Sequence, residues 1–330
     1  MNTTIDALPA QQRRDWKELA SGFLVRHIMV AVMLLIVAFF AYRSARFATP
    51  DNFTNILIAA APFALIALGQ TLVILTGGID LSVGSVMAAS AMAAAWTAKN
   101  AGDNLMLPLL AALATGLLAG AINGLIVSKF EVPPFITTLG MLTLASGIAY
   151  VIGNGAPING LPASFGSFAN TQVLGLTLPV VLMIIAILVL AFVMKRTNYG
   201  LRVYAIGGNR LAAEIAGVRS RGILFSVYAI SGVLAGLSGL MLASRVITGA
   251  PNLGQGYELD AIAAVVIGGA SLMGGRGTVW GTAVGLLLIQ TINNGLDLLL
   301  VPAYWQNVIK GVIIVAAVGV DVWAARRGRR

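Results

Sequence analysis

Residues 71–90 read "TLVILTGGIDLSVGSVMAAS" and contain a single acid, Asp80. No other side chain between residues 52 and 98 is charged. The adjacent glycines, Gly77 and Gly78, each weaken a helix by about 1 kcal/mol relative to alanine. We therefore expect one apolar helix to end at these glycines and the next to begin near Asp80. Irregular backbone at membrane depth is tolerated only where it is buried in protein or lines a water-filled cavity.

Two roles are open for Asp80. At the start of a helix, its carboxylate can accept backbone N–H groups of the first turn, and it meets the positive end of the helix dipole. Beside a cavity, Asp80 and Ser82 can contact a hydroxyl-rich molecule that crosses the membrane. The two roles are compatible with each other.

The composition excludes an ordinary soluble domain. Hydrophobic residues make up 58% of the 330 residues, charged residues 10%, and the mean hydropathy is +0.90. A soluble domain has about 25% charged residues. The chain has no cysteine, which excludes disulfides and thiol chemistry. The chain is therefore expected to be an integral membrane protein.

Apolar runs of about 20 residues predict ten transmembrane helices. We expect a cytoplasmic segment at residues 1–21 without a removable signal peptide, a transmembrane domain at 22–325, and a basic cytoplasmic tail at 326–330. The ten predicted spans are 22–42, 55–76, 81–98, 107–127, 134–152, 173–194, 223–243, 259–273, 278–296 and 304–324.

The net charge of +9 indicates topology rather than nucleic-acid binding. Most Lys and Arg residues fall on one side of the membrane if the amino terminus is cytoplasmic, including those of the loop 195–222 and of the tail. The positive-inside rule then places both termini in the cytoplasm and favours an even number of spans. A re-entrant 259–273 would send the basic tail to the other side.

Two short stretches echo one another. The first, "GLLAGAING" at residues 116–124, and the second, "GTVWGTAVG" at 277–285, each carry glycines at four-residue spacing. Small faces of this kind let helix backbones approach closely, although glycine is common in membrane helices in general. The stretches fall in the fourth and ninth spans. We therefore expect an all-α fold of two five-helix halves, inverted relative to one another because five is odd.

Four ordered motifs resemble a known family. They read "LVILTGGIDLSVGSVMA" (72–88), "NGLIVSKFEVPPFITTLGM" (123–141), "YAIGGNRLAAEIAGV" (204–218) and "GYELDAIAAVVIGGASLMGGRGTVWGT" (256–282). Together they are similar to the permease subunits of ATP-binding-cassette importers for monosaccharides of the ribose, xylose and galactose type. The resemblance extends from about residue 47 to residue 321.

The resemblance implies the partners. These are a second permease copy in a homodimer, a cytoplasmic ATP-binding subunit, and a periplasmic sugar-binding protein, all at the bacterial inner membrane. The chain contains neither a GxxxxGK[ST] motif nor a Gly-Lys pair, so it does not cradle ATP phosphates. We expect no cofactor in this chain, with ATP and magnesium used by the partner ATPase.

Residues 209–217 predict a short capped helix in the loop 195–222. Asn209 suits the N-cap and Gly217 the C′ position. Such a helix has little reason to exist alone in water, so it is an ordinary loop, lies on anionic lipid, or docks on a partner. By resemblance it is the coupling helix that docks on the ATPase; its residues are Asn209, Arg210, Leu211, Ala212, Ala213, Glu214, Ile215, Ala216 and Gly217.

The order of the charged residues on this helix differs from the order that is common in the family. The family often has an acid and then a base at the positions of Arg210 and Glu214, and here the order is reversed. We expect the groove of the ATPase to be charge-swapped to match. We also expect Ala213 to lie on the face that contacts the ATPase.

Hexoses and pentoses are neutral polyols, so their path is expected to present amides and hydroxyls. For each of the amides and threonines taken alone, a hydrogen bond between helices is the favoured role. The identity of the sugar is expected to depend mainly on the binding protein. The candidates are Gln70, Asp80, Ser82, Asn123, Thr137, Thr138, Gln290, Asn293 and Asn294.

Two other functions have less support in the sequence. An ion-coupled secondary sugar transporter would carry ionisable relays inside the membrane, but only Asp80 and Lys310 qualify, and Lys310 is expected to pair with Asp297. An intramembrane serine protease could use Ser238 of "GLSG", but it needs a base on a later helix, and the one histidine is His27. Ser238 is therefore expected to belong to a small packing face.

Overall fold

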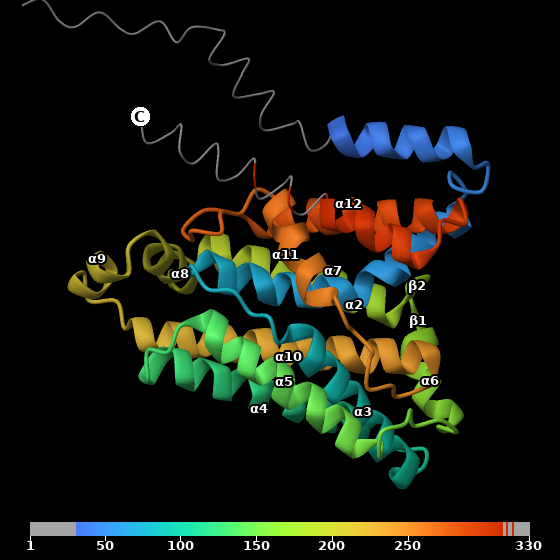
Figure 1. Ribbon diagram of the computed structural model, residues 1–330, viewed down its shortest axis with the longest axis horizontal. Coiled ribbons are helices and arrows are strands. Elements are labelled where there is room, and N and C mark those ends of the chain that lie inside the picture. Colours follow the sequence, from blue (N-terminus) through green and yellow to red (C-terminus); the bar gives the residue numbers. More distant parts are fainter. Residues whose placement is uncertain (1–30, 313–314, 316–318, 320–330) are drawn as a thin grey trace, which may run out of the picture.

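The computed structural model describes residues 31–312, 315 and 319, which form a helical bundle with one short β-hairpin (Figure 1). The hairpin pairs β1 (Gln172–Val173) with β2 (Leu176–Thr177) in antiparallel register. The helix Ala31–Arg43 precedes the labelled helices, and residues 303–312 are helical at the other end. The labelled helices are α2 (Pro50–Leu75), α3 (Val83–Ala101), α4 (Met106–Lys129), α5 (Pro134–Ile152), α6 (Ala163–Asn170), α7 (Leu178–Arg196), α8 (Asn198–Gly208), α9 (Arg210–Ile215), α10 (Ser220–Val246), α11 (Tyr257–Ile267) and α12 (Val279–Leu298).

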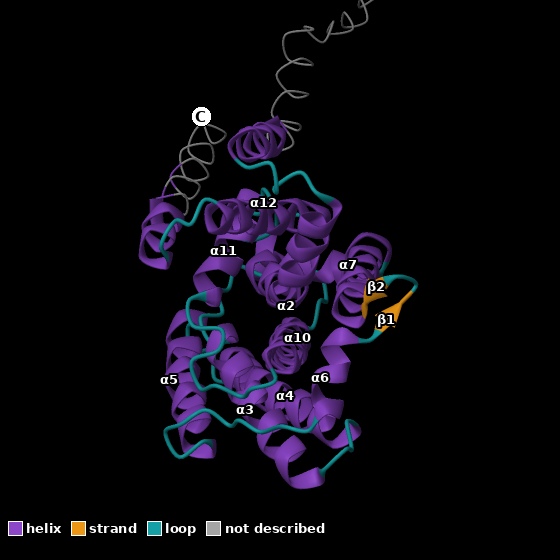
Figure 2. Cartoon of the chain, turned by 90° about the vertical axis from the view of Figure 1, so that its right-hand side faces the viewer, coloured by secondary structure: helices purple, strands orange, loops and turns teal. Residues whose placement is uncertain are grey.

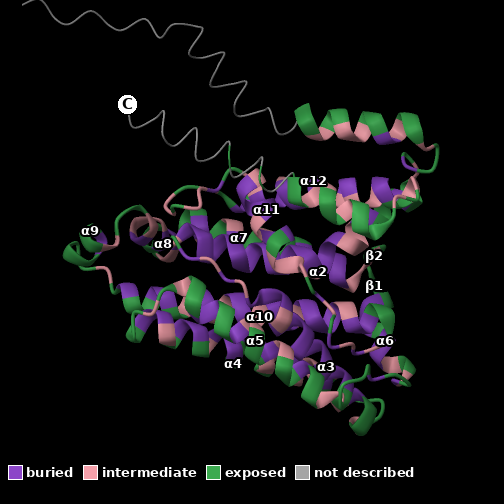
Figure 3. Cartoon of the chain, in the orientation of Figure 1, coloured by how far each residue is buried: buried purple, intermediate pink, exposed green. Residues whose placement is uncertain are grey.

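Helices α2 and α10 form the centre of the bundle (Figure 2). Helices α3, α4 and α5 lie on one side of this pair, and α11 and α12 lie on the other. Within the described residues, α2, α4, α5, α7 and α10 are long and apolar enough to cross a membrane. The outer helices expose leucine, isoleucine and phenylalanine side chains, such as Leu118, Phe135 and Phe192, whereas the inner pair is largely buried (Figure 3). An apolar surface around a buried centre identifies an integral membrane protein.

Close glycine contacts join the central helices to their neighbours, as the small faces predicted. A Cβ built on Gly120 of α4 would lie 3.0 Å from the Cα of Gly232 on α10. On α12, a Cβ on Gly285 would lie 3.0 Å from the backbone nitrogen of Gly268. Only glycine permits helices this close. Gly277 is an exception to the prediction, because it precedes α12 in a backbone conformation with φ +143°.

Ser238 is a packing residue, as expected. It is fully buried on α10, and its hydroxyl donates a hydrogen bond to the carbonyl oxygen of Pro62 on α2 at 2.6 Å. Its neighbour Gly239 lies against the backbone of Met87 on α3. Three helices therefore meet at the "GLSG" stretch.

Two predicted spans differ from the helices that form. The predicted span 259–273 contains α11 of 11 residues, about 16 Å long, which is half the thickness of the hydrocarbon core. The chain leaves α11 at Gly268 and Gly269, the latter with φ +86°. Residues 172–177 form the hairpin rather than the start of a span, and α7 begins at Leu178 with a proline in its first turn.

The loop 195–222 is more ordered than expected, because α8 precedes the short predicted helix. Residues 22–30 of the first predicted span (22–42) lie outside the described residues, as do 313–314, 316–318 and 320–324 of the last (304–324). The segment 1–21, His27 and the tail 326–330 also lie outside them.

Two interruptions bring two helix starts together inside the bundle. After α2, residues 76–82 return to the interior, and α3 begins beside the middle of α10, where Ser231 contacts Asp80. After α10, residues 247–256 also return to the interior, and α11 begins beside the first turn of α3. A Cβ on Gly254 would lie 2.8 Å from the carbonyl oxygen of Gly84.

Candidate functional site

The short helix α9, with its caps at residues 209 and 217, forms as the sequence predicts; we call it the docking helix. The Asn209 side chain caps its start, because its Oδ1 accepts the backbone N–H of Ala212 at 3.0 Å. At its end, Gly217 has φ +86° and donates to the carbonyl of Glu214, while Val218 donates to the carbonyl of Ala213. This pair of bonds is a Schellman motif, which the glycine makes possible.

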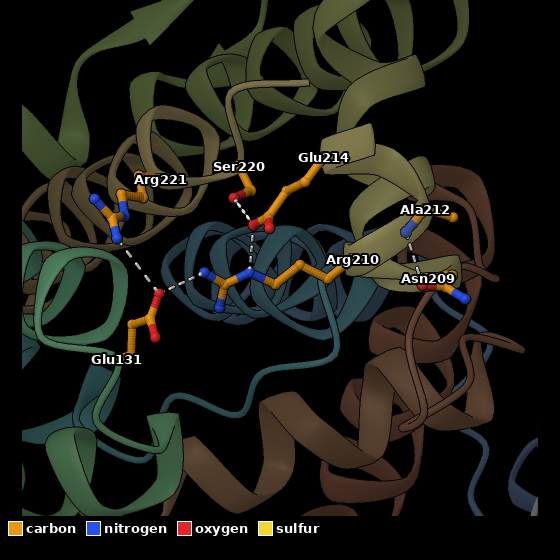
Figure 4. Close-up of polar contacts among 7 residues, drawn as sticks. All are labelled: Glu131, Asn209, Arg210, Ala212, Glu214, Ser220 and Arg221. Carbon is orange, nitrogen blue, oxygen red and sulfur yellow. Dashed lines mark hydrogen bonds and ion pairs between the residues drawn. The ribbon is translucent and has the colours of Figure 1, made fainter. Parts of the chain in front are cut away.

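A charged network ties the docking helix to the rest of the chain (Figure 4). Arg210 Nε donates to Glu214 Oε1 at 2.9 Å, and its guanidinium also lies 3.3 Å from Glu131 in the loop between α4 and α5. Arg221 lies 3.7 Å from the same Glu131 oxygen, and the Ser220 hydroxyl donates to Glu214. The reversed order of Arg210 and Glu214 is thus matched within the chain, by Glu131.

The hydrogen bond from Ser220, followed by that from Arg210, holds the pKa of the Glu214 carboxyl below its ordinary value. Both groups favour the ionised form. Glu214 is therefore ionised near neutral pH.

The expectation for Ala213 is wrong. Its side chain is only 5% exposed and packs in the cluster that includes Ile206 and Leu224, so it faces this chain's own interior. The exposed apolar residues of the helix are Leu211, at 69%, and Ile215, at 80%. Residues four positions apart share one helix face. The surface available to a partner is therefore centred on Leu211 and Ile215.

Four predicted path residues come together at the first interruption. Asp80 Oδ1 accepts from the Ser82 backbone at 2.9 Å and from its hydroxyl at 2.6 Å. Asn123 donates to the Ser82 hydroxyl at 3.0 Å, and Thr138 donates to the carbonyl of Ile79 at 3.2 Å. Ser231 of α10 donates to Asp80 Oδ2 at 3.3 Å. We call Asp80, Ser82, Asn123, Thr138 and Ser231 the first-break cluster.

Asp80 is not the N-cap of α3. The helix begins at Val83, and its N-cap is Ser82, whose side chain makes no capping bond. Asp80 instead fixes the turn before the helix, because it lies two residues before the N-cap and accepts the N–H of that residue.

A small cavity of about 120 Å³ lies between the first-break cluster and the docking helix. Tyr228, Gly77 and Gly78 line one part of it, and Glu131 and Arg210 line another. Among the described residues, the Tyr228 hydroxyl, Asn123 Oδ1 and Thr137 Oγ1 are buried without a hydrogen-bond partner. The charged network therefore borders the same cavity as an unpartnered buried hydroxyl.

The remaining path candidates lie elsewhere. Asn294 exchanges two hydrogen bonds with Asn52 of α2, at 2.8 and 2.9 Å, so it joins helices. Gln70 is fully buried on α2, and in the described part of the chain its amide has no partner; the same holds for Asn293 Oδ1 on α12. Gln290 is half-buried on α12. None of these four contributes a hydrogen bond to the first-break cluster within the described residues.

The expected pair of Lys310 and Asp297 is also wrong. Lys310 Nζ lies 2.9 Å from Asp260 of α11, while Asp297 accepts a hydrogen bond from Gln306 at 2.8 Å. Asp260 is largely buried, so it gains more from a cation than the exposed Asp297 does.

Three residues of these sites were not among the predicted ones: Ser231 of the first-break cluster, Glu131 and Glu258. Glu131 completes the charged network, and Glu258 of α11 lines a second pocket where α3 and α11 begin. Both lie in quoted motifs, "FEVPP" and "GYELD". An acid beside glycines or prolines, at the start of an apolar run, is the signal that they share with Asp80.

Interrupted helices with polar groups at their breaks define a membrane transport protein. Residues 52–318 match the family described as "branched-chain amino acid transport system / permease component", and the chain belongs to this family. It is therefore a transport permease and not an enzyme.

Named relatives cover almost the whole chain. The ribose import permease protein RbsC of Bacillus subtilis is 41% identical over 291 residues, which are 88% of this chain and 90% of the relative. That of Escherichia coli is 41% identical over 304 residues, 91% and 94% of the two chains. The galactose/methyl galactoside import permease protein MglC of Escherichia coli is 38% identical, over 88% and 92%. No solved structure matches the chain. The resemblance found in the sequence is confirmed.

Proposed function

We propose that this chain is the membrane-spanning permease subunit of an ATP-driven importer, which passes a monosaccharide from a periplasmic binding protein into the cytoplasm. The observation that carries the proposal is 41% identity to ribose import permeases over about nine-tenths of both chains. The proposal includes a homodimer in the bacterial inner membrane, and an ATPase subunit that uses ATP and magnesium.

The docking helix supports the proposal that a separate ATPase subunit supplies the energy for transport. Its caps hold it in one conformation, and Leu211 and Ile215 stay exposed to a partner. Exposed apolar groups on a rigid helix are typical of a protein–protein contact. We place this helix, and both termini, on the cytoplasmic side.

The interrupted helices support two inverted halves. Helix α2 with its break precedes α3 in the first half, and α10 with its break precedes α11 in the second. Each break is followed by a helix that starts inside the bundle, where transporters of inverted repeats bind their substrates. This arrangement favours the count of ten spans, with α11 and the segment after it acting as one crossing.

The ion-coupled alternative has less support. Within the described helices, Asp80 is bound by serine groups and Lys310 is paired with Asp260, so neither of these two is a free relay, whereas Glu258 has no cationic partner. Relays need a group that exchanges protons or ions during transport. The relatives named above are import permeases of sugars, which also favours the ATP-driven importer.

The test is uptake in proteoliposomes that contain the permease, its ATPase and the binding protein loaded with D-ribose or D-galactose. Uptake is expected to require ATP and to persist when a protonophore collapses the proton gradient. An ATPase variant that cannot hydrolyse ATP is the matched control. Uptake that needs the gradient but not ATP would establish the ion-coupled alternative.

A further inference from the structure

A second pocket lies where α3 and α11 begin. Its volume is about 230 Å³, below the range of about 300–1,000 Å³ for pockets that hold drug-sized ligands. The pocket volume therefore suits a solute smaller than a drug-sized ligand. The pocket is built from α3, α5, the segment 251–255 and α11, which are far apart in sequence.

The polar lining suits a polyol. It presents two serine hydroxyls, one phenol, two amides and one carboxylate, and these belong to Ser85, Ser146, Tyr150, Asn252, Gln255 and Glu258. Apolar groups, among them Ala88 and Leu142, line the rest. A sugar ring has hydroxyls at its edge and C–H groups on its faces, so it matches alternating polar and apolar walls. The lining holds no Lys, Arg or His, which also suits a neutral ligand.

Glu258 is held in place but is not neutralised. Its carboxylate lies against the backbone of Gly84. A Cβ on Gly84 would collide with this carboxylate and would lie 2.5 Å from the carbonyl of Gly254. Among the described residues, no cation pairs with Glu258. The acceptor sites of this carboxylate are therefore free for hydroxyl donors.

The first-break cluster lacks this property. Both oxygens of Asp80 already accept hydrogen bonds from serine groups, and its side chain is 2% exposed. Glu258, by contrast, lines an open pocket. The first interruption therefore joins helices, whereas the second leaves a carboxylate at the wall of a pocket.

We propose that Glu258, with Ser146, Asn252 and Gln255, forms a contact site for the monosaccharide during its passage through the permease. This inference rests on the proposed function of the chain. The carboxylate of Glu258 accepts hydrogen bonds from two sugar hydroxyls, and the amides of Asn252 and Gln255 both donate and accept. Binding is weak and non-covalent, so that the sugar can leave toward the cytoplasm.

The natural absence of cysteine permits a direct test by thiol labelling. Ser146→Cys places a reactive group in the pocket, and Ser167→Cys, on an exposed position of α6, is the matched control. The purified permease is labelled with a small thiol reagent in the presence of D-ribose, D-galactose or sucrose. We expect a transported monosaccharide to slow labelling of Ser146→Cys, whereas sucrose does not, and labelling of Ser167→Cys to stay unchanged. Equal labelling of Ser146→Cys with and without each monosaccharide would overturn the proposal.

Transport measurements supply the second arm. Glu258→Gln is expected to lower the uptake rate at least about tenfold, the effect of one lost hydrogen bond to a charged group. Asp297→Asn, an exposed acid at the end of α12, is the control and should transport normally. Uptake within twofold of the unaltered chain for Glu258→Gln would also overturn the site. If the unaltered chain itself shows no ATP-dependent uptake, the proposed function has failed, and this result differs from that of either variant.

Discussion

The guanidinium of Arg210, on the docking helix, lies 3.3 Å from the carboxylate of Glu131, in the loop between α4 and α5. This loop leads directly into α5, whose residues line the pocket at the start of α3 and α11. The surface that a partner can contact is thus connected to the interior of the bundle through the Arg210–Glu131 contact and then through α5. Arg210 and Glu131 thus connect the docking helix to the segment that precedes α5.

Loss of this contact should weaken coupling without releasing the ATPase. Glu131→Gln removes two exposed ion pairs, with Arg210 and Arg221, each worth about 0.2–1 kcal/mol, while Leu211 and Ile215 stay in place. We expect the number of sugars carried per ATP to fall up to about fivefold, as measured in proteoliposomes. Asp103→Asn, in another exposed loop, is the control. An unchanged ratio of sugar to ATP would show that Glu131 has no part in coupling.

The double variant Arg210→Glu with Glu214→Arg separates two partners for these charges. It keeps an ion pair on the helix but turns an acid toward Glu131. If Glu131 is the partner, coupling falls while the ATPase still co-purifies at low and moderate salt. If the ATPase groove is matched to the charges, as first expected from the reversed order, recovery of the ATPase falls instead.

The exposed face of the docking helix should determine whether the permease assembles with the ATPase. Ile215→Asp places a charge at an 80% exposed position, so the free permease should fold normally, whereas a charge buried in the contact costs several kcal/mol. We expect the ATPase to be lost from the purified complex. Leu174→Asp, at a 98% exposed position of the β-hairpin, is the matched control. Full recovery of the ATPase with Ile215→Asp would remove α9 from the interface.

Ala213→Asp should act differently from Ile215→Asp. Because Ala213 is 5% exposed within the chain, the substitution buries a charge in the permease itself. We expect a lower melting temperature of the purified permease without its ATPase. A normal melting temperature would contradict the burial of Ala213.

Asp80 should matter for stability through its hydrogen bonds. Asp80→Asn keeps one acceptor and is expected to be mild, whereas Asp80→Leu leaves donors of Ser82 and Ser231 without partners. Each unsatisfied buried group costs about 1–3 kcal/mol. Thermal unfolding in detergent measures the difference. Equal melting temperatures of Asp80→Leu and the unaltered protein would show that the cluster does not stabilise the fold.

The contact of α4 with α10 should tolerate no added side chain. A Cβ on Gly232 would lie 2.8 Å from the Cα of Gly120, so Gly232→Ala is expected to cost about 1–3 kcal/mol through overpacking. Gly140→Ala, on α5 with open space around it, is the matched control and should be neutral or stabilising. Comparable melting temperatures for the two variants would contradict the close contact.

The sequence by itself determined the features that depend on neighbouring residues. Hydropathy over windows of about 20 residues identified an integral membrane protein. The helix break followed from Gly77 and Gly78, and the docking helix from Asn209 and Gly217, because caps and breaks act within one or two turns. These signals depend only on neighbouring residues, so they can be recognised without knowledge of the fold.

Only the tertiary structure decided which side chains meet. Ala213 and Ile215 have similar apolar character, yet one is buried and the other exposed, because α8 and α10 cover one face of α9. Arg210 meets Glu131, Lys310 meets Asp260 rather than Asp297, and α11 stops after 11 residues. These contacts join residues that are 50 or 79 positions apart. Their partners depend on how helices pack, and a sequence pattern with a period of one helical turn carries no information about that packing.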